Sequence, residues 1–229
     1  MIKKIFALVV ISACQVVSAD APDSFSKAKK VLQEIYSDNR VTFYCNCEFD
    51  EKGVIDPETC GYEPRKHVYN DGKINWEHVV PASVFGRLLP CWEQGGRKNC
   101  QKTSSVFRSM EADMHNLVPS IGELNSDRAN FKFGEIKGEP RNYGRCDFEV
   151  DFKRQIVEPK NNIRGDIARI YLYMNDLAVE SIGRGFLTKE QKKMYSKWHK
   201  NDPPVGWECE KDGIVMDIQG NGNPYLSGC

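Results

Sequence analysis

Apolar side chains recur at helical spacing in three segments of the chain. The first follows Ser24, a residue type that caps helices, and places these side chains on one face: Phe25, Ala28, Leu32, Ile35 and Tyr36. A second stripe consists of Ile167, Ile170, Tyr171 and Met174. In the third segment, Thr188 and Gln191 have capping-box spacing and open a helix that contains Met194, Tyr195 and Trp198. We interpret the stripes as core faces of helices.

Shorter apolar runs indicate strands. Residues 41–44 are β-branched and aromatic, which favours a strand. Residues 74–80 predict a strand that Pro81 stops, and residues 114–118 predict another that Pro119 stops, because proline cannot donate to a β-ladder.

A further helix should follow the second of these proline-terminated strands. Ser120 and Glu123 again have capping-box spacing, and the helix they open would carry Asn125, Arg128 and Asn130. Residues 50–73 are polar and rich in turn formers, while residues 201–229 are acidic and predict an irregular tail held by Cys209 and Cys229. With no linker and no repeat, the pattern predicts a mixed α+β fold, a helix-rich single domain.

The N-terminal segment has the features of a secretory signal. Lys3 and Lys4 precede an apolar run, and small residues at 17–19 offer a cleavage site, so residues 1–19 are predicted to be a signal peptide and residues 20–229 the functional domain. An alternative is lipoprotein processing with a lipid anchor on Cys14. The apolar run is too short to span a bilayer as a helix.

Composition and charge narrow the class of protein. The 229 residues are 40% hydrophobic and 28% charged, which excludes a disordered chain, a collagen-like rod and a multi-span membrane protein. The whole chain has 32 basic and 32 acidic side chains; removal of the signal leaves 30 basic ones and a net charge of about −2. A polyanion must therefore be attracted by a local basic patch.

An even set of cysteines remains after Cys14 is set aside. In an exported chain these are expected to form four disulfides, whose connectivity the sequence leaves open among 105 possibilities. Metal ligation is the alternative, but no Cys-x-x-Cys pair occurs. The cysteines are Cys45, Cys47, Cys60, Cys91, Cys100, Cys146, Cys209 and Cys229.

The candidate chemistry lies between residues 76 and 130. Glu77 and His78 are adjacent on the strand at 74–80, Asn116 follows on the next strand, and the helix after it carries Asn125. An isolated Glu-His pair is more often structural, but the order strand, strand, helix resembles the ββα-metal, His-Asn-His-like nuclease site. Hydrolysis of a phosphodiester needs an activated water and charge stabilisation, which a neutral imidazole and a Mg²⁺ ion on oxygen ligands can supply.

One geometric condition applies to this pair of residues. Neighbouring side chains on a regular strand point to opposite faces. Glu77 and His78 can therefore serve one site only if the strand bulges or ends there.

Several motifs, in order, resemble the endonuclease I family of bacterial periplasmic and secreted nucleases. The similarity runs from about Phe25 to the end and is carried by residues 76–81 (WEHVVP), 95–100 (GGRKNC), 113–117 (DMHNL), 122–125 (GELN) with Arg128 and Asn130, and 207–210 (WECE). The resemblance implies a magnesium-dependent endonuclease that cuts DNA and RNA without sequence specificity, exported to the periplasm or medium and monomeric. The family's cysteine pattern is also present and implies four disulfides.

The resemblance also implies roles for individual residues. His78 would be the general base, Glu77 and Asn125 would bind a single Mg²⁺ ion, and Arg97 would contact the scissile phosphate. Glu111 and Asn116 would hold the site residues in position without contacting the substrate, and Asn116 would hold the loop that positions His78.

Charge distribution gives Arg97 a separate argument. Residues 86–109 contain the basic side chains Arg87, Arg97, Lys98, Lys102 and Arg108 against the single acid Glu93. A solvated loop is the simpler explanation for such a run, but its place between the two candidate strands favours a basic cleft for a phosphate backbone. His115 is expected to neighbour the site, and His67 and His199 to lie on the surface.

Two other functions remain open on the residues alone. A disulfide-rich exported binding module would bind a ligand without turnover. Another exported hydrolase is also conceivable, although no His-Glu-x-x-His zinc motif occurs.

Overall fold

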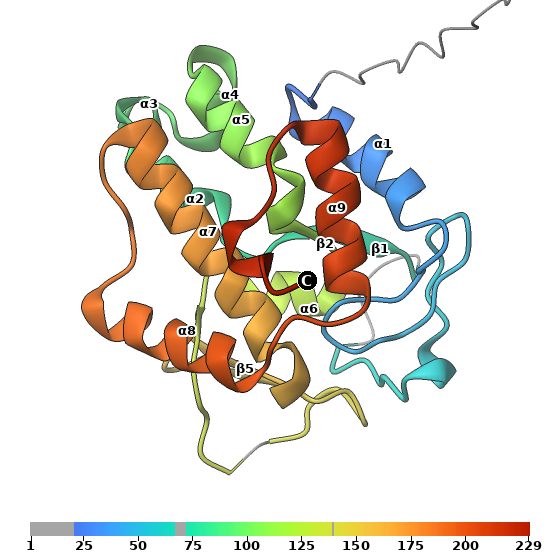
Figure 1. The fold of residues 1–229 in the computed structure, drawn as a ribbon. Helices are drawn as coiled ribbons and strands as arrows, with labels where there is room; N and C mark the ends of the chain where they lie inside the picture. Colours follow the sequence, from blue (N-terminus) through green and yellow to red (C-terminus); the bar gives the residue numbers. More distant parts are fainter. Residues whose placement is uncertain (1–20, 67–71, 139) are drawn as a thin grey trace, which may run out of the picture.

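The computed structural model describes residues 21–66, 72–138 and 140–229, arranged as helices around two small sheets (Figure 1). The predicted signal peptide, the alternative lipid site at Cys14, and His67 lie outside these residues. The helices are α1 (Phe25–Ile35), α2 (Ala82–Gly86), α3 (Pro90–Glu93), α4 (Gly96–Thr103), α5 (Ser105–Ala112), α6 (Gly122–Arg128), α7 (Arg164–Ile182), α8 (Lys189–Asn201) and α9 (Trp207–Gln219). The strands are β1 (Ile74–His78), β2 (Leu117–Ile121), β3 (Lys132–Phe133), β4 (Phe148–Asp151) and β5 (Ile156–Pro159). The predicted α+β class is confirmed.

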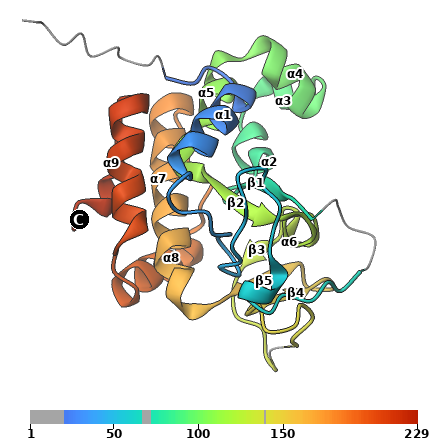
Figure 2. The same cartoon turned by 90° about the vertical axis from the view of Figure 1, so that its right-hand side faces the viewer.

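The two sheets are built from different parts of the chain. Strands β1 and β2 form an antiparallel pair in which His78 lies opposite Leu117 and Glu77 opposite Val118. In the other sheet β5 is central, parallel to β3 and antiparallel to β4. The short helices α2 to α5 occupy the connection between β1 and β2 and are grouped on one side of the molecule (Figure 2).

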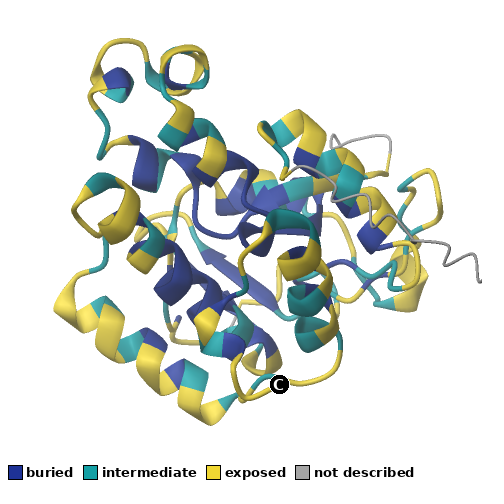
Figure 3. Ribbon diagram, turned by 45° about the horizontal axis from the view of Figure 1, so that its top comes forward, coloured by how far each residue is buried: buried dark blue, intermediate teal, exposed yellow. Residues whose placement is uncertain are grey.

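Helix α7 is central to the core. Eleven of its residues are buried, including the predicted stripe Ile167, Ile170, Tyr171 and Met174. The ring of Tyr171 stacks on Tyr195 of α8 with centroids 4.5 Å apart. Figure 3 shows buried residues on the strands and the inward sides of the helices, with the exposed ones outside. The helical stripes predicted from the sequence are therefore confirmed as core.

Helix α8 begins as the sequence predicts. The Thr188 hydroxyl accepts the Gln191 N–H, and the Gln191 side chain accepts the Thr188 N–H, which completes the capping box. Helix α1 follows Ser24 as predicted, although the serine side chain makes no capping bond.

Helix α9 corrects the prediction of an irregular C-terminal tail. Its first turn carries Glu208 and Glu210, whose charges suit a helix N-terminus. The completely buried Arg169 of α7 binds both carboxylate oxygens of Glu208, at 2.6 and 2.5 Å. The Lys211 ammonium donates to the Leu117 carbonyl at 2.8 Å. Tertiary contacts therefore stabilise a helix whose own sequence has no strong apolar stripe.

The expected strand at residues 41–44 is also wrong. Thr42 N–H donates to the Cys47 carbonyl, and Asn46 N–H donates back to the Thr42 carbonyl, closing a tight turn. Asn46 adopts a left-handed conformation with φ of 57°, which asparagine tolerates well. Only Val41 retains a β-bridge, to Glu48.

Strand β2 begins three residues later than predicted, and Pro119 lies inside it rather than ending it. Val79 N–H donates to the Asn116 carbonyl, so residues 79 and 116 form a hydrogen-bonded pair. Hydrogen-bonded and non-hydrogen-bonded pairs alternate along an antiparallel ladder. Pro119, which lies opposite Trp76, therefore belongs to a non-hydrogen-bonded pair. The proline nitrogen therefore needs no ladder partner. Its carbonyl accepts the Phe43 N–H at 2.8 Å.

The predicted capping box at Ser120 does not form. Ser120 belongs to β2, and α6 starts after Ile121 without a side-chain cap. Glu123 instead accepts the Tyr62 hydroxyl and the N–H groups of Arg65 and Lys66. The helix itself is present, but it ends at Arg128 and leaves Asn130 beyond it.

All eight cysteines outside the N-terminal segment are paired, as predicted. The bridges are Cys45–Cys146, Cys47–Cys60, Cys91–Cys100 and Cys209–Cys229. Within the described ranges, every helix is too short or too polar to cross a lipid bilayer.

Candidate active site

A cleft of about 300 Å³ opens at the end of β1, and we call it the β1 cleft. Four of the predicted site residues line it: Glu77, His78, Arg97 and Asn125. They come from β1, α4 and α6, and the outermost two, Glu77 and Asn125, are 48 positions apart in the chain. The cleft is also lined by Phe25 of α1 and by Arg128 of α6. Residues scattered along the sequence thus share one solvent-accessible space.

The geometric condition on Glu77 and His78 is met by the end of the strand. His78 is the last residue of β1, and the chain turns immediately afterwards toward α2. Both residues line the β1 cleft, Glu77 from within β1 and His78 from its last position.

His78 is held in a defined tautomer. Its Nε2 lies 2.9 Å from the backbone carbonyl of Glu111. A carbonyl oxygen only accepts hydrogen bonds, so Nε2 carries the proton in the neutral ring and Nδ1 keeps its lone pair. Burial, against the Phe25 ring with centroids 4.6 Å apart, lowers the pKa of His78 to about 4. The ring is therefore a neutral base at physiological pH.

Glu77 is buried beside a fixed positive charge. Its Oε1 accepts the Tyr44 hydroxyl at 2.9 Å and lies 3.2 Å from the Arg128 guanidinium. Burial raises the pKa of Glu77 to about 7, while Arg128 and Tyr44 act in the opposite direction. The Tyr44 hydrogen bond and the Arg128 ion pair both fall on Oε1.

Arg97 is oriented from behind by a buried carboxylate. Glu111 accepts the Arg97 Nε–H at 2.5 Å and is itself held by Gln101 at 2.9 and 3.0 Å. The Arg97 side chain remains 43% exposed, so its guanidinium reaches solvent from the wall of the cleft. The Nε of the guanidinium is thus fixed by Glu111 while the side chain remains accessible to solvent.

Asn116 fixes the turn after His78. Its Oδ1 accepts the Val80 N–H at 2.7 Å, and its Nδ2 donates to the Val80 carbonyl at 3.0 Å. Both residues are completely buried. A single side chain therefore satisfies both backbone groups of Val80, two residues after His78.

Comparison with known proteins identifies the family of this chain. The family model described as Endonuclease I matches residues 11–229. The chain belongs to the endonuclease I family.

Three relatives illustrate how far the similarity extends. An extracellular deoxyribonuclease of Aeromonas hydrophila is 48% identical over 207 residues, covering 89% of this chain and 88% of its own. A periplasmic deoxyribonuclease of the same organism is 45% identical over 212 residues, covering 91% and 87%. The Endonuclease-1 of Buchnera aphidicola is 41% identical over 207 residues, covering 89% and 80%. A lipid anchor at Cys14 is not borne out by these extracellular and periplasmic relatives.

Arg128 has a larger place in the site than its sequence position indicates. The guanidinium is completely buried and donates to the carbonyls of His78 and Val79 as well as contacting Glu77. It also donates to the Tyr171 hydroxyl at 3.0 Å, linking the cleft to α7. Its position one helical turn after Asn125 is a signal for a shared face, but the sequence could not show which backbone it meets.

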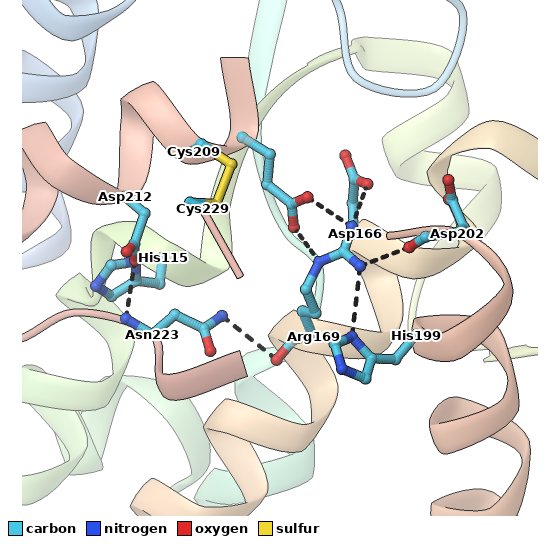
Figure 4. Close-up of a disulfide and its surroundings, with 10 residues drawn as sticks. His115, Asp166, Arg169, His199, Asp202, Cys209, Asp212, Asn223 and Cys229 are labelled. Atoms are coloured by element: carbon cyan, nitrogen blue, oxygen red, sulfur yellow. Dashed lines mark hydrogen bonds and ion pairs between the residues drawn. A yellow bond between two sulfur atoms is a disulfide. The ribbon is translucent and has the colours of Figure 1, made fainter. Parts of the chain in front are cut away.

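His115 does not belong to the cleft, contrary to expectation. Its Nε2 donates to the Asn221 carbonyl at 2.8 Å, and its Nδ1 lies 3.4 Å from Asp212 near the Cys209–Cys229 disulfide (Figure 4). His199 is half-buried on α8, where Arg169 lies 3.5 Å from its Nδ1. Neither histidine lines the β1 cleft.

The donor set of the cleft suits a hard cation. In the described part of the chain, no three His, Cys, Asp or Glu side chains gather as a ready-made metal cluster. The cleft does provide the Glu77 carboxylate and the Asn125 amide, both with oxygen donors of the type Mg²⁺ prefers. The residues present therefore fit a magnesium ion that keeps most of its waters.

Proposed function

We propose that this protein is an exported endonuclease that hydrolyses the phosphodiester bonds of DNA, and also of RNA, without reading base sequence. The observation that carries the proposal is the oriented, neutral His78 ring in one cleft with Glu77, Asn125 and Arg97. The family and the names of the three relatives support a nuclease acting in the periplasm or outside the cell.

His78 is assigned as the general base. With Nε2 donating to Glu111, the free Nδ1 lone pair can take a proton from the attacking water. The resulting imidazolium keeps its hydrogen bond to the carbonyl, which stabilises the added charge. The Glu111 backbone thus selects the nitrogen that reacts.

Glu77 and Asn125 are assigned to a single Mg²⁺ ion. When bound, such an ion would neutralise developing charge on the phosphate and its leaving oxygen. Glu77 contributes the carboxylate that Arg128 and Tyr44 hold from one side.

Arg97 is assigned to the phosphate. A guanidinium forks onto phosphate oxygens and stays charged at any working pH. Contacts of this kind address the backbone, which is the same for every base, and therefore support cleavage without sequence preference.

A plasmid-nicking assay tests the proposal. With added Mg²⁺ we expect conversion of supercoiled plasmid to nicked and linear forms, degradation of a structured RNA, and no reaction in EDTA. His78→Ala should lose at least 100-fold in rate, in line with removal of a general base. His199→Ala on α8 is the matched control and should keep the parent rate.

Three results would contradict parts of this assignment. Parent-rate cleavage by His78→Ala would refute the base, and undiminished activity in EDTA would refute the cation at Glu77 and Asn125. Saturable binding without turnover under any condition would favour the binding module. We expect a monomer in solution, which size-exclusion chromatography with light scattering checks.

A further inference from the structure

A second, larger groove of about 720 Å³ continues from the β1 cleft, and we call it the α1 groove. The two share Phe25, Trp76 and Asn125 in their walls. From there the α1 groove runs between helix α1 and the start of β1 with the turn at residues 50–53. The cleft that holds His78 is therefore one end of a longer depression.

The walls of the α1 groove carry uncompensated positive charge. Lys29 and Lys30 reach it from α1, and Lys73 reaches it from the residue before β1. Within the described ranges, none of these three lysines has an ion-pair partner; Lys29 lies 4.8 Å from the centre of the Phe25 ring. Phe25 also lines the β1 cleft, so Lys29 lies where the two depressions meet.

The acidic residues of the same groove are already engaged. Glu51 lies 3.9 Å from Arg40, another groove residue. Asp50 accepts the N–H groups of Lys52 and Val54 through Oδ1 and so closes its own turn. Two acidic residues line the groove against five basic ones, so its charge is positive although the whole chain is neutral; the basic residues are Lys29, Lys30, Arg40, Lys52 and Lys73.

Aromatic side chains form the remaining walls. Tyr36 and Trp76 meet edge to face with centroids 5.6 Å apart, and Phe25 and Phe49 flank them. Low-dielectric walls around charges of one sign concentrate the field along the groove. The 11 residues of α1 extend about 16 Å at 1.5 Å per residue, which matches roughly five nucleotide steps of B-DNA.

We propose that the α1 groove binds the sugar-phosphate backbone on one side of the cleaved bond, through Lys29, Lys30 and Lys73. The inference rests on the proposed function and adds a binding surface to it. The basic segment at residues 86–109 reaches the β1 cleft through Arg97, so the α1 groove and this segment would both contribute positive charge around His78. Lys29 and Lys73 are 44 positions apart, which is why the surface is not visible as a charge run.

Two triple variants, each compared with the parent protein, test the proposal. The groove variant carries Lys29→Gln, Lys30→Gln and Lys73→Gln. The control carries Lys189→Gln, Lys192→Gln and Lys193→Gln, three exposed lysines of α8, a helix distant from α1 (Figure 1). Both remove three positive charges, so any effect of net charge is the same.

Two measurements are made on each protein. Dissociation constants for a 30-base-pair duplex are measured by fluorescence anisotropy in a His78→Ala background with Mg²⁺, from 50 to 200 mM NaCl. Hydrolysis of bis(4-nitrophenyl) phosphate, which is too small to reach the α1 groove, is measured with His78 intact.

The groove variant should bind the duplex at least about 40-fold more weakly than the control at 50 mM NaCl. Its slope of log Kd against log salt should be smaller by about 2.7, because each lost phosphate contact removes about 0.9. Between 50 and 200 mM NaCl, its Kd should therefore rise about 40-fold less than that of the parent. Hydrolysis of the small diester should stay within twofold, and a Lys→Arg triple variant at the same positions should restore binding.

Equal Kd values and equal salt slopes for the groove variant and the control would overturn the proposal. So would a proportional loss of small-diester hydrolysis, because it would place the lysines in the cleft itself. A parent that binds the duplex but never cleaves it would refute the proposed function while leaving the groove to be judged on Kd. Absence of duplex binding by the parent would overturn both.

Discussion

Removal of the Asn116 side-chain amide should destabilise the fold and the site together. In Asn116→Ala, the Val80 N–H and carbonyl lose partners at 2.7 and 3.0 Å in a completely buried place. Each unsatisfied buried group costs about 1–3 kcal/mol, so we expect a loss of about 2–6 kcal/mol in the free energy of unfolding. The Asn116 backbone still accepts the Val79 N–H, so the pairing of β1 with β2 should survive.

The assay combines urea unfolding, followed by tryptophan fluorescence, with plasmid nicking under folding conditions. We expect the midpoint to fall and kcat to drop, because Val80 lies two residues beyond His78 and its turn sets the ring position. Asn201→Ala, at an exposed asparagine at the end of α8, is the control and should change stability by less than about 0.5 kcal/mol.

Asn116→Asp sharpens the test because it keeps the size and the acceptor for the Val80 N–H. The oxygen that replaces Nδ2 faces the Val80 carbonyl, which favours the protonated acid in the folded state and raises its pKa. A raised carboxyl pKa means that the folded state binds more protons, so the variant should lose stability as pH rises from about 4 toward 8. If Asn116→Ala matched Asn201→Ala in urea, or if Asn116→Asp showed no such pH dependence relative to the parent, the reasoning would be refuted.

Further predictions concern titration, positioning and covalent stabilisation. At limiting Mg²⁺, activity should fall as pH drops below about 7, because Glu77 must be ionised to bind the cation. At saturating Mg²⁺, the fall in activity should move to about pH 4, where His78 becomes protonated. If the pH at which activity falls on the acid side did not change with Mg²⁺ concentration, the assignment of Glu77 would be contradicted. Glu111→Gln should raise KM for DNA, because Arg97 loses its charged partner and becomes mobile. An unchanged KM would argue against that role. Replacing Cys209 and Cys229 with serine should cost about 3 kcal/mol from a 20-residue loop yet leave plasmid cleavage intact, and lost cleavage by the folded protein would contradict this.

Local patterns in the sequence determined much of the fold. The helical stripe of α7 and the capping box of α8 depend on residues within a few positions of one another, so the sequence alone reveals them. The same holds for α1, for the strand that carries Glu77 and His78, and for the even set of cysteines.

Tertiary contacts decided what local patterns could not. Residues 41–44 have strand propensity, but two disulfides at Cys45 and Cys47 and the turn at Asn46 hold this part of the chain in a loop. Helix α9 has little apolar periodicity, and its Lys211 and Glu208 find their partners on β2 and α7, about 94 and 39 positions away in the chain.

The site divides in the same way. The types and order of Glu77, His78 and Asn125 predict hydrolytic chemistry, because the reaction needs a base and oxygen ligands. Which ring nitrogen is free depends on the Glu111 carbonyl, and the turn that follows depends on Arg128, 50 positions from His78. The sequence gives the types of residue in the site. The protonation of His78, the orientation of its ring and the electric field around it depend on distances that exist only after the chain has folded.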